Sequence, residues 1–328
     1  MMKVVVVILS AVLALGSFTA PLLVQAQQPG KAYRIGYLKI GGSVAEDPLV
    51  PIFEQALRER GWIMAENLVI TYRTADGTYD RLPSIAAELV RLDPQVIVAV
   101  STSGTRAAKN ATSTIPIVMW GVGDPIGQGL VTSFARPGGN VTGFADASPD
   151  AYAKQLQLLM EAVPHARRIA YLTNPANQAT PVDAVKEAAR TLGIELLIVG
   201  ARGPEDLATA FRTMTHAKAD ALLVSDDGVF FRQLGRLADL SLRSRLPSMC
   251  GNGNYAAVGG LMNYSVDRAD TVRKVAGYVD RLLRGAKPAE LPVEQPTKFS
   301  FVINLKSAKA LGLSIPPPLL LQAEQVIE

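Results

Sequence analysis

The stretch IPIVMWGVGDPIGQGLVTSFARPGGNVTGF, residues 115–144, decides how the chain is interpreted. A short apolar run at residues 117–119 ends in a Gly-Asp-Pro turn, and a helix-like piece leads to a second Gly-rich break at residues 137–139. Another β-prone run begins at Val141. We therefore expect a strand, a ligand-facing loop at residues 121–124, and a second strand that ends the first half of the protein. Residues 142–145 are expected to cross to the second half.

Alternating β and α segments on both sides of this stretch predict the fold class. Strand-like runs are expected at residues 33–38, 68–72, 95–100, 168–172, 194–199, 221–224, 246–249 and 299–304. Amphipathic helical segments separate most of these runs, as in parallel, doubly wound sheets. The four-unit pattern repeats after residues 136–140, which favours two lobes over one large sheet. Residues 316–318, three consecutive prolines, are expected to lack regular structure.

The N-terminus predicts export from the cytoplasm. Lys3 precedes an apolar run at residues 4–15, and Val24-Gln25-Ala26 forms a small-residue cleavage site. This pattern is typical of a secretory signal peptide over residues 1–26, with cleavage after Ala26, so we expect a periplasmic protein. Cys250 is the single cysteine, so no intramolecular disulfide is expected. The formal net charge of +4 is spread along the chain without a Lys/Arg run, which argues against nucleic-acid binding.

Small and polar residues follow the predicted strands, where open α/β sheets bind their ligands. Each such residue is also an ordinary turn or helix-cap residue, but several of these loops meeting at one edge favour a shared site. The candidate ligand-binding residues are Ser101, Thr102, Ser103, Gly121 and Asp124 in the first half, and Asn174, Ser225, Asp226, Asp227 and Asn252 in the second.

The sharpest of these candidates are the hydroxyl cluster at residues 101–103 and the acidic pair of Asp226 and Asp227. Hydroxyls before a helix N-terminus can hold a carboxylate, and we expect a helix at residues 104–111. The two aspartates can hold a cationic group from the other side. Together they suit an amino acid or another zwitterion, although the same residues are also suited to capping a helix.

Signatures of enzymes and of bound metals or cofactors are missing from the sequence. His165 and His216 have no ligand partner at metal spacing, and there is no G-x-S-x-G motif. The run GVGDPIGQG at residues 121–129 resembles a dinucleotide fingerprint only loosely, because Pro125 interrupts the expected helix start. Cys250 has no histidine partner in the sequence pattern, so we expect a buried or loop thiol. We therefore predict no catalysis, no cofactor and no metal.

Four segments carry a family resemblance that covers essentially the whole chain after the predicted signal peptide. In the order of the chain they are IPIVMWGVGDPIGQGLV at residues 115–131, RPGGNVTGF at 136–144, INLKSAKALGL at 303–313 and IPPPLLLQAEQVIE at 315–328. They resemble the ABC transporter substrate-binding proteins of the tryptophan/phenylalanine-binding-like family. The resemblance implies a periplasmic binding protein type I fold, with two Rossmann-like lobes joined by three crossovers that close on a ligand.

The resemblance also implies lobe boundaries and the source of the ligand contacts. Lobe 1 is expected at residues 31–144 plus 267–293, and lobe 2 at residues 145–266 plus 294–328. Residues 101–103 match the loop that meets the ligand carboxylate in amino-acid-binding relatives, Asp124 lies in the loop after the fourth strand, and Asn174 and Asp227 match polar cleft positions. At Asn252 the aromatic-amino-acid binders often carry an acid, and residues 39–47 lack the aromatic or histidine often found there.

The resemblance favours one function and leaves a second open. The first is a monomeric periplasmic receptor that captures a small solute, an amino acid or related carboxylate, for the permease and ATPase subunits of an ABC importer. The alternative is an exported sensor that presents its bound solute to a membrane signalling receptor, because both functions use the same lobes.

Overall fold

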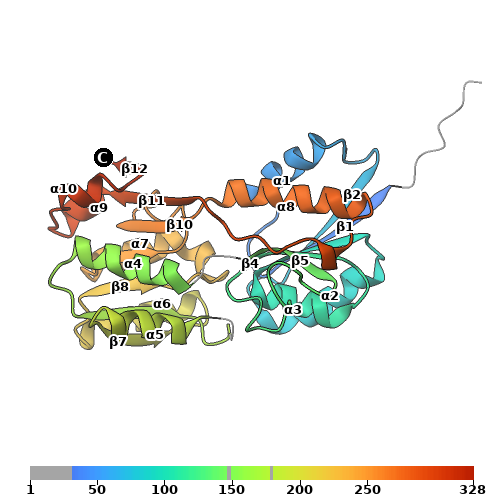
Figure 1. The fold of residues 1–328 in the computed structure, drawn as a ribbon. Helices are drawn as coiled ribbons and strands as arrows, with labels where there is room; N and C mark the ends of the chain where they lie inside the picture. The colour runs from blue at the N-terminus through green and yellow to red at the C-terminus, as the bar shows by residue number, and fades with distance from the viewer. Residues whose placement is uncertain (1–31, 146–148, 178–179) are drawn as a thin grey trace, which may run out of the picture. The chain divides into compact units, whose positions relative to one another are not determined.

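The computed structural model describes residues 32–145, 149–177 and 180–328. The predicted signal peptide and its cleavage site lie outside these described residues. Residues 33–328 form one compact unit that contains two β-sheets, each covered by helices on both faces (Figure 1). Among the described residues, no helix combines the length and the apolar character needed to cross a membrane.

The first sheet holds five parallel strands in the order β2-β1-β3-β4-β5. Helices α1 and α8 pack on one face of this sheet, and α2 and α3 pack on the other. The neighbours of β1 are β2 on one side and β3 on the other, so the strand order reverses at β1. The strands are β1 (Tyr33–Lys39), β2 (Leu68–Thr74), β3 (Val96–Val100), β4 (Ile117–Val122) and β5 (Val141–Ala145), and the helices are α1 (Leu49–Arg58), α2 (Leu82–Arg91), α3 (Ser101–Ala111) and α8 (Arg268–Leu283).

The second sheet holds seven strands in the order β12-β11-β10-β9-β8-β6-β7. All neighbouring strands run parallel except β10 and β11, which pair antiparallel. Helices α4 and α5 cover one face, and α6 and α7 cover the other. The strands are β6 (Arg168–Thr173), β7 (Glu195–Gly200), β8 (Ala221–Val224), β9 (Ser248–Cys250), β10 (Met262–Val266), β11 (Phe299–Asn304) and β12 (Gln325–Ile327), and the helices are α4 (Pro149–Ala162), α5 (Val182–Thr191), α6 (Pro204–His216) and α7 (Leu234–Arg243).

Short helical segments complete the chain. One of them, η1, follows β2, and another, η2, follows β8, so each lies at the edge of a sheet where its strands end. The segments are η1 (Tyr79–Arg81), η2 (Phe230–Gln233), η3 (Pro288–Glu290), α9 (Leu305–Ala310) and α10 (Pro317–Leu320).

The chain passes between the two sheets more than once, which gives a two-lobed fold of discontinuous segments. After β10 of the second sheet it enters α8, whose Val272, Val275 and Tyr278 belong to the core of the first sheet. It then runs beside β5, where the Glu294 amide donates to the Gly143 carbonyl at 3.0 Å, before it returns to the second sheet as β11. The predicted residue boundaries of the two lobes stay a prediction.

Three local expectations were wrong. Described residues 123–140 form turns and bends where we expected a helix-like piece, because Gly129 adopts a positive φ of 66° and the segment contains Pro125 and Pro137. Residues 141–145 form the edge strand β5 and do not themselves cross to the second half. The triple proline starts the one-turn helix α10, since proline is tolerated in the first turn of a helix.

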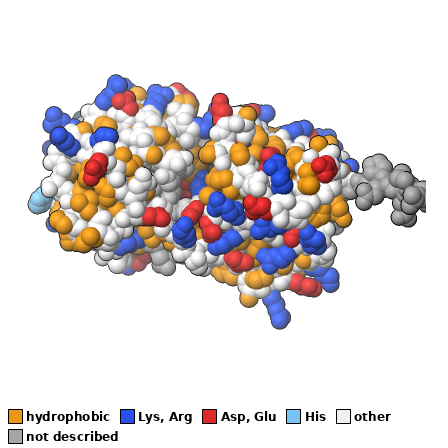
Figure 2. All heavy atoms as spheres, turned by 90° about the horizontal axis from the view of Figure 1, so that it is seen from above, with side chains coloured by type: hydrophobic (Ala, Val, Ile, Leu, Met, Phe, Trp, Pro, Cys, Tyr) orange, Lys and Arg blue, Asp and Glu red, His pale blue; other side chains and the backbone are white. Residues whose placement is uncertain are grey.

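Acidic and basic side chains are mixed on the face seen from above, with no extended region of a single sign (Figure 2). Such a surface does not create the strong one-sign potential that attracts a nucleic acid.

Candidate functional site

A cleft of about 1030 Å³ lies where the carboxyl ends of the two sheets meet. Its walls come from both lobes, and each wall includes residues that directly follow a strand. The first lobe contributes Tyr37, Lys39, Ser101, Trp120 and Gly121, and the second contributes Asp226, Gly228, Phe231, Asn252 and Ser265, with Arg268 at the junction of β10 and α8. In open α/β sheets this is the edge at which ligands bind, since the strand order reverses there.

Ser101 forms the start of α3 in a conformation that residues with side chains rarely adopt. Its φ is +72°, and its Oγ accepts a hydrogen bond at 3.3 Å from the amide of Gly104. The amides at the start of a helix have no acceptor inside the helix, and the helix dipole adds a partial positive charge there. A left-handed non-glycine residue costs on the order of 1–3 kcal/mol and is common at ligand sites. The first turn of α3 therefore presents amide donors at the cleft.

A bulge within β4 places an aromatic ring in the same wall. The pairing of β4 with β5 shifts register between Met119 and Val122, and Gly121 has a φ of +72°. Bulges of this kind turn a side chain away from the regular pleat. The ring of Trp120 is 4% exposed and lines the cleft.

Asp227 is the centre of a hydrogen-bond network that joins the two lobes. Its Oδ1 accepts from Asn174 Nδ2 at 3.3 Å and from the amide of Val229 at 2.8 Å. Its Oδ2 accepts from Asn177 Nδ2 at 2.9 Å and from the hydroxyl of Tyr79, a first-lobe residue, at 2.7 Å. Burial and the adjacent Asp227 charge raise the pKa of the Tyr79 phenol far above its usual range, so it stays a donor.

The backbones of the two lobes also touch beside this network. A Cβ atom added at Gly228 would lie 2.2 Å from Ile40 Cγ2, and one added at Gly41 would lie 3.0 Å from the Gly228 carbonyl oxygen. An atom at 2.2 Å from Ile40 Cγ2 overlaps it, so a side chain at position 228 does not fit without a shift. Glycine at position 228 is therefore required for the lobes to approach as they do here.

Two ion pairs line the cleft. Lys39 and Asp47, both largely buried, form one pair in the loop after β1, and Asp47 Oδ1 also accepts from the amide of Leu49 at 3.0 Å. Arg268 Nη2 lies 3.7 Å from Asp226 Oδ1 in the other pair. The Arg268 guanidinium carbon lies 4.3 Å from the centre of the Phe231 ring and 5.8 Å from that of Trp120. Arg268 thus contacts an aromatic ring from each lobe.

A comparison with protein families decides the identity of the chain. The ABC transporter substrate binding protein family matches residues 45–327. The chain belongs to this family. The family resemblance predicted from the sequence is thus confirmed, as is the two-lobed α/β fold of the periplasmic binding protein type I class.

Individual relatives of this substrate-binding protein agree with the family. A tyrosine-binding protein of Clostridioides difficile (strain R20291) is 27% identical over 263 residues, which cover 80% of this chain and 75% of that protein. A Streptococcus pneumonia ABC domain in complex with L-Trp is 27% identical with a TM-score of 0.82, covering 90% of this chain and all of the other. The ligand-free, open structure of a Clostridium difficile substrate-binding protein with adhesive properties is 26% identical with a TM-score of 0.65, covering 90% of this chain and 99% of the other.

These comparisons bear on the arrangement of the lobes. The identities of the two solved structures to this chain are nearly equal and their coverage of it is the same, yet the L-Trp complex superposes better than the open, ligand-free structure. The hydrogen bond between Tyr79 and Asp227 also requires the lobes to lie close together. The overall structure of this substrate-binding protein is therefore more similar to the L-Trp complex than to the open structure.

The family also bears on catalysis. Its members are binding components and not enzymes, as the sequence predicted. Cys250 is buried, and burial raises the pKa of its thiol to about 12, so almost no thiolate forms at neutral pH.

The cleft brings together some of the residues proposed from the sequence. Ser101, Gly121, Asp226 and Asn252 line it, and Asn252 Oδ1 accepts from the amide of Asn254 at 3.0 Å. Whether these four touch a ligand stays a prediction.

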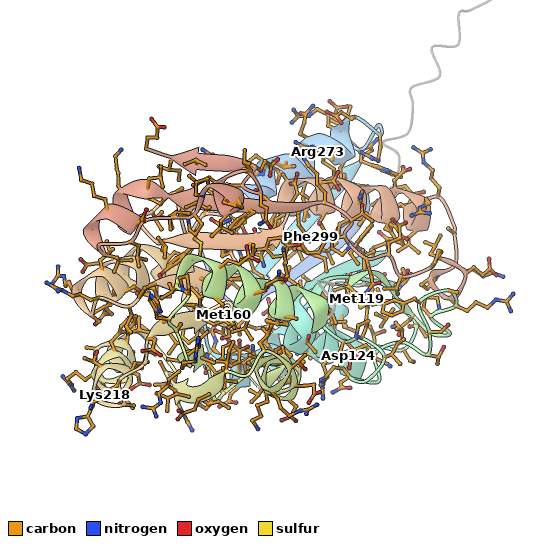
Figure 3. The ribbon with its side chains drawn as sticks, turned by 60° about the vertical axis from the view of Figure 1, so that its left-hand side comes forward. Met119, Asp124, Met160, Lys218, Arg273 and Phe299 are labelled. Atoms are coloured by element: carbon orange, nitrogen blue, oxygen red, sulfur yellow. The ribbon has the colours of Figure 1, made fainter. Side chains whose placement is uncertain are left out.

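The other six proposed residues do not line the cleft. Thr102 is buried in α3, next to the partly buried Ser103, and both are part of the helix itself, which begins three residues earlier than expected. Asn174, Ser225 and Asp227 are buried behind the second wall. Asp124 is exposed, and its Oδ1 accepts from the amide of Gly127 at 2.9 Å; Figure 3 shows it on the first lobe, away from α8. Their roles in binding also stay a prediction.

Sequence reasoning missed Arg268, Trp120, Phe231 and Tyr79. The sequence does contain a signal for Arg268. This residue directly follows Asp267, which caps α8 by accepting a hydrogen bond from the amide of Asp270 at 3.0 Å. An arginine as the first residue of that helix is unfavourable for the helix dipole, which suggests a purpose other than helix stability. The role of Tyr79 depends on how the lobes approach one another, and no local pattern contains that information.

Proposed function

We propose that this protein captures an amino acid or a related carboxylate between its two lobes for an ABC importer. One observation carries the proposal: the same cleft has the first turn of α3 on one wall and the Asp226 carboxylate on the other. Amides at a helix N-terminus suit a carboxylate, and an aspartate suits an ammonium group. The two walls are thus complementary to a zwitterion.

The ligands named for two relatives indicate which compounds to test first. One is named a tyrosine-binding protein, and another was solved in complex with L-Trp. In this chain the rings of Tyr37, Trp120 and Phe231 line the cleft, and such rings favour an aromatic or aliphatic side chain. L-tyrosine and L-tryptophan are accordingly the first compounds to test.

The proposed mechanism is hinge closure. A ligand that contacts both walls adds binding energy only when the lobes are together, so it shifts the population toward the closed state. Protein contacts such as the Tyr79–Asp227 hydrogen bond add to that preference. Closure then presents the loaded protein to its partners.

The proposed partners are the permease and ATPase subunits of the importer at the inner membrane. Family membership supports this assembly. The predicted signal peptide supports a periplasmic location, and we propose that the protein acts there as a monomer.

Thermal-shift screening of the purified mature protein tests the function. The library contains the twenty amino acids, aromatic acids and small carboxylates. A compound at about 100 times its Kd stabilises the folded state by about 2.7 kcal/mol, which gives a clear rise in Tm. The proposal is contradicted if no compound in these classes raises the Tm. Small-angle scattering of a hit then measures closure as a ligand-dependent decrease in the radius of gyration.

A further inference from the structure

Arg268 is an unusual cation in the cleft. It is the first residue of α8, so it stands where the chain passes from the second sheet to the first. Its guanidinium lies over the ring of Phe231, which follows β8 in the second lobe, and near the ring of Trp120 in β4 of the first lobe. Two aromatic rings hold the planar group in position and leave its N–H edges directed elsewhere.

The described part of the chain does not use the hydrogen-bonding capacity of this guanidinium. Arg268 carries five N–H donors, yet its side chain makes no hydrogen bond to another described residue, and only 22% of the side chain is exposed. The Asp226 oxygen at 3.7 Å is beyond normal hydrogen-bond distance. Arg268 lines the cleft, so its N–H groups are available to an acceptor that a ligand provides.

A second observation points to the same acceptor. The hydroxyl of Ser265, three residues before Arg268, lines the cleft and has no hydrogen-bond partner among the described residues. This side chain is 4% exposed, so water competes little for it. The N-terminus of the long helix α8 adds positive potential beside both groups.

We infer that Arg268 donates to the ligand's carboxylate together with the amides at the start of α3, with Ser265 as an accompanying donor, so that the cleft selects for carboxylates. This inference rests on the proposed function and assigns a specificity-determining residue to it. A guanidinium matches a planar carboxylate through two parallel hydrogen bonds. A doubly charged phosphate suits the site less well, because Asp226 beside Arg268 repels additional negative charge.

The position of Arg268 also links recognition to closure. Its two rings belong to different lobes, so the aromatic clamp is complete only when the lobes are together. A carboxylate bound by Arg268 therefore favours the closed arrangement. An uncharged ligand of the same size receives no such preference.

The test compares matched acids and amides by isothermal titration calorimetry, with L-tyrosine and L-tyrosinamide as the first pair and L-tryptophan and its amide as the second. If the wild type binds neither acid, any carboxylate that raises the Tm in the library, with its amide, replaces them. We expect the amide to bind wild type at least about 30-fold more weakly than the acid. In Arg268→Gln the affinity for the acid falls by about the same factor, and the difference between acid and amide largely disappears.

Two further variants complete the design. Arg268→Lys keeps the charge but loses the paired geometry, so we expect an intermediate affinity for the acid. The control is Arg273→Gln, which removes an exposed arginine from the same helix (Figure 3) and is expected to bind as wild type does. A melting curve of each variant reports folding, and the comparison of acid with amide in the wild type needs no variant.

Each result of these titrations tests a different claim: the role of Arg268, the preference for carboxylates, or the proposed ligand classes. Equal binding of acid and amide by wild type, or retained discrimination in Arg268→Gln, overturns the role of Arg268 while the binding function stands. Binding of only uncharged solutes overturns both the carboxylate assignment and the choice of amino acids, but not the family. If no compound binds, the proposed ligand classes and this inference both fail.

Discussion

The two walls of the cleft are built differently. On the first lobe the polar groups come mainly from the backbone, with the amides of α3, the bulge at Gly121 and the strained Ser101, beside the rings of Tyr37 and Trp120. On the second lobe side chains dominate, with Asp226 in the cleft and Asp227 held by four hydrogen bonds behind it. A backbone wall is fixed in advance by local conformation, whereas a side-chain wall is specified by residue identity. Substitutions should therefore affect binding mainly through the second wall and through the contacts between the walls.

The largest expected effect comes from keeping the walls apart. In Gly228→Ala the new methyl group overlaps Ile40, so the lobes cannot approach fully. Forcing extra atoms into a packed contact costs up to about 3 kcal/mol, so we expect affinity to fall by about 100-fold. Calorimetry measures the affinity. Gly235→Ala, where the added Cβ meets no atom within 4 Å, is the control and should bind as wild type does. Wild-type affinity in Gly228→Ala would show that closure does not bring these segments together.

The second wall is next tested by removing its charge. Asp226→Asn should weaken binding of L-tyrosine by about 30-fold, equivalent to about 2 kcal/mol, because the ammonium group loses its anionic partner. The deaminated analogue hydroxyphenylpropionate should bind at least as well as to wild type, since Arg268 then carries a less neutralised charge. Calorimetry with both compounds checks that Asp226→Asn weakens the binding of L-tyrosine but not that of hydroxyphenylpropionate. Parallel losses for both compounds would mean that Asp226 does not contact the ammonium group.

A smaller effect is expected for the hydrogen bond between the walls. Tyr79→Phe removes the donor to Asp227, and a hydrogen bond to a charged group contributes about 1.5–3 kcal/mol. We expect about tenfold weaker binding, with the dissociation rate raised and the association rate little changed. Surface plasmon resonance separates the two rates. Tyr33→Phe, at a partly exposed ring in the first lobe, serves as the control. An unchanged dissociation rate in Tyr79→Phe would mean that this bond does not hold the closed state.

The smallest effect concerns the strain in the first wall. Ser101→Ala loses the Gly104 cap and keeps the left-handed conformation, whereas Ser101→Gly loses the same cap and relieves the strain. The glycine variant should therefore be more stable than the alanine variant by about 1 kcal/mol. Urea unfolding measures this difference. Equal stability of the two variants would show that the conformation at Ser101 is not strained.

Much of the fold follows from local sequence patterns, and much of the site does not. Strands β8 and β11 have the predicted bounds, because short apolar runs between turn residues specify strands clearly. Strands β10 and β12 were missed, since neither stands out from its surroundings. The position of Ser101 at the carboxyl end of β3 was predictable, but its role as the first residue of α3 was not.

The site is less predictable because its groups meet through tertiary structure. Tyr79 and Asp227 are 148 residues apart, and their hydrogen bond exists only once two lobes have formed and approached. The clamp around Arg268 likewise needs Trp120 and Phe231 from different sheets. Local spacing indicates which edge of each sheet binds a ligand, but not which side chains face each other across the cleft.

The contribution of α8 to the first lobe has a consequence for the order of folding. Val275 and Ala276 of this helix pack in one core with Ile35 and Phe53, so that core is incomplete until residue 283 is available. A chain that emerges from its N-terminus must therefore release five strands of the second sheet before the first lobe can finish folding. Contacts between residues so far apart in sequence slow folding. The first lobe is therefore not completed by the N-terminal half of the chain alone, and a chain truncated before α8 should remain incompletely folded.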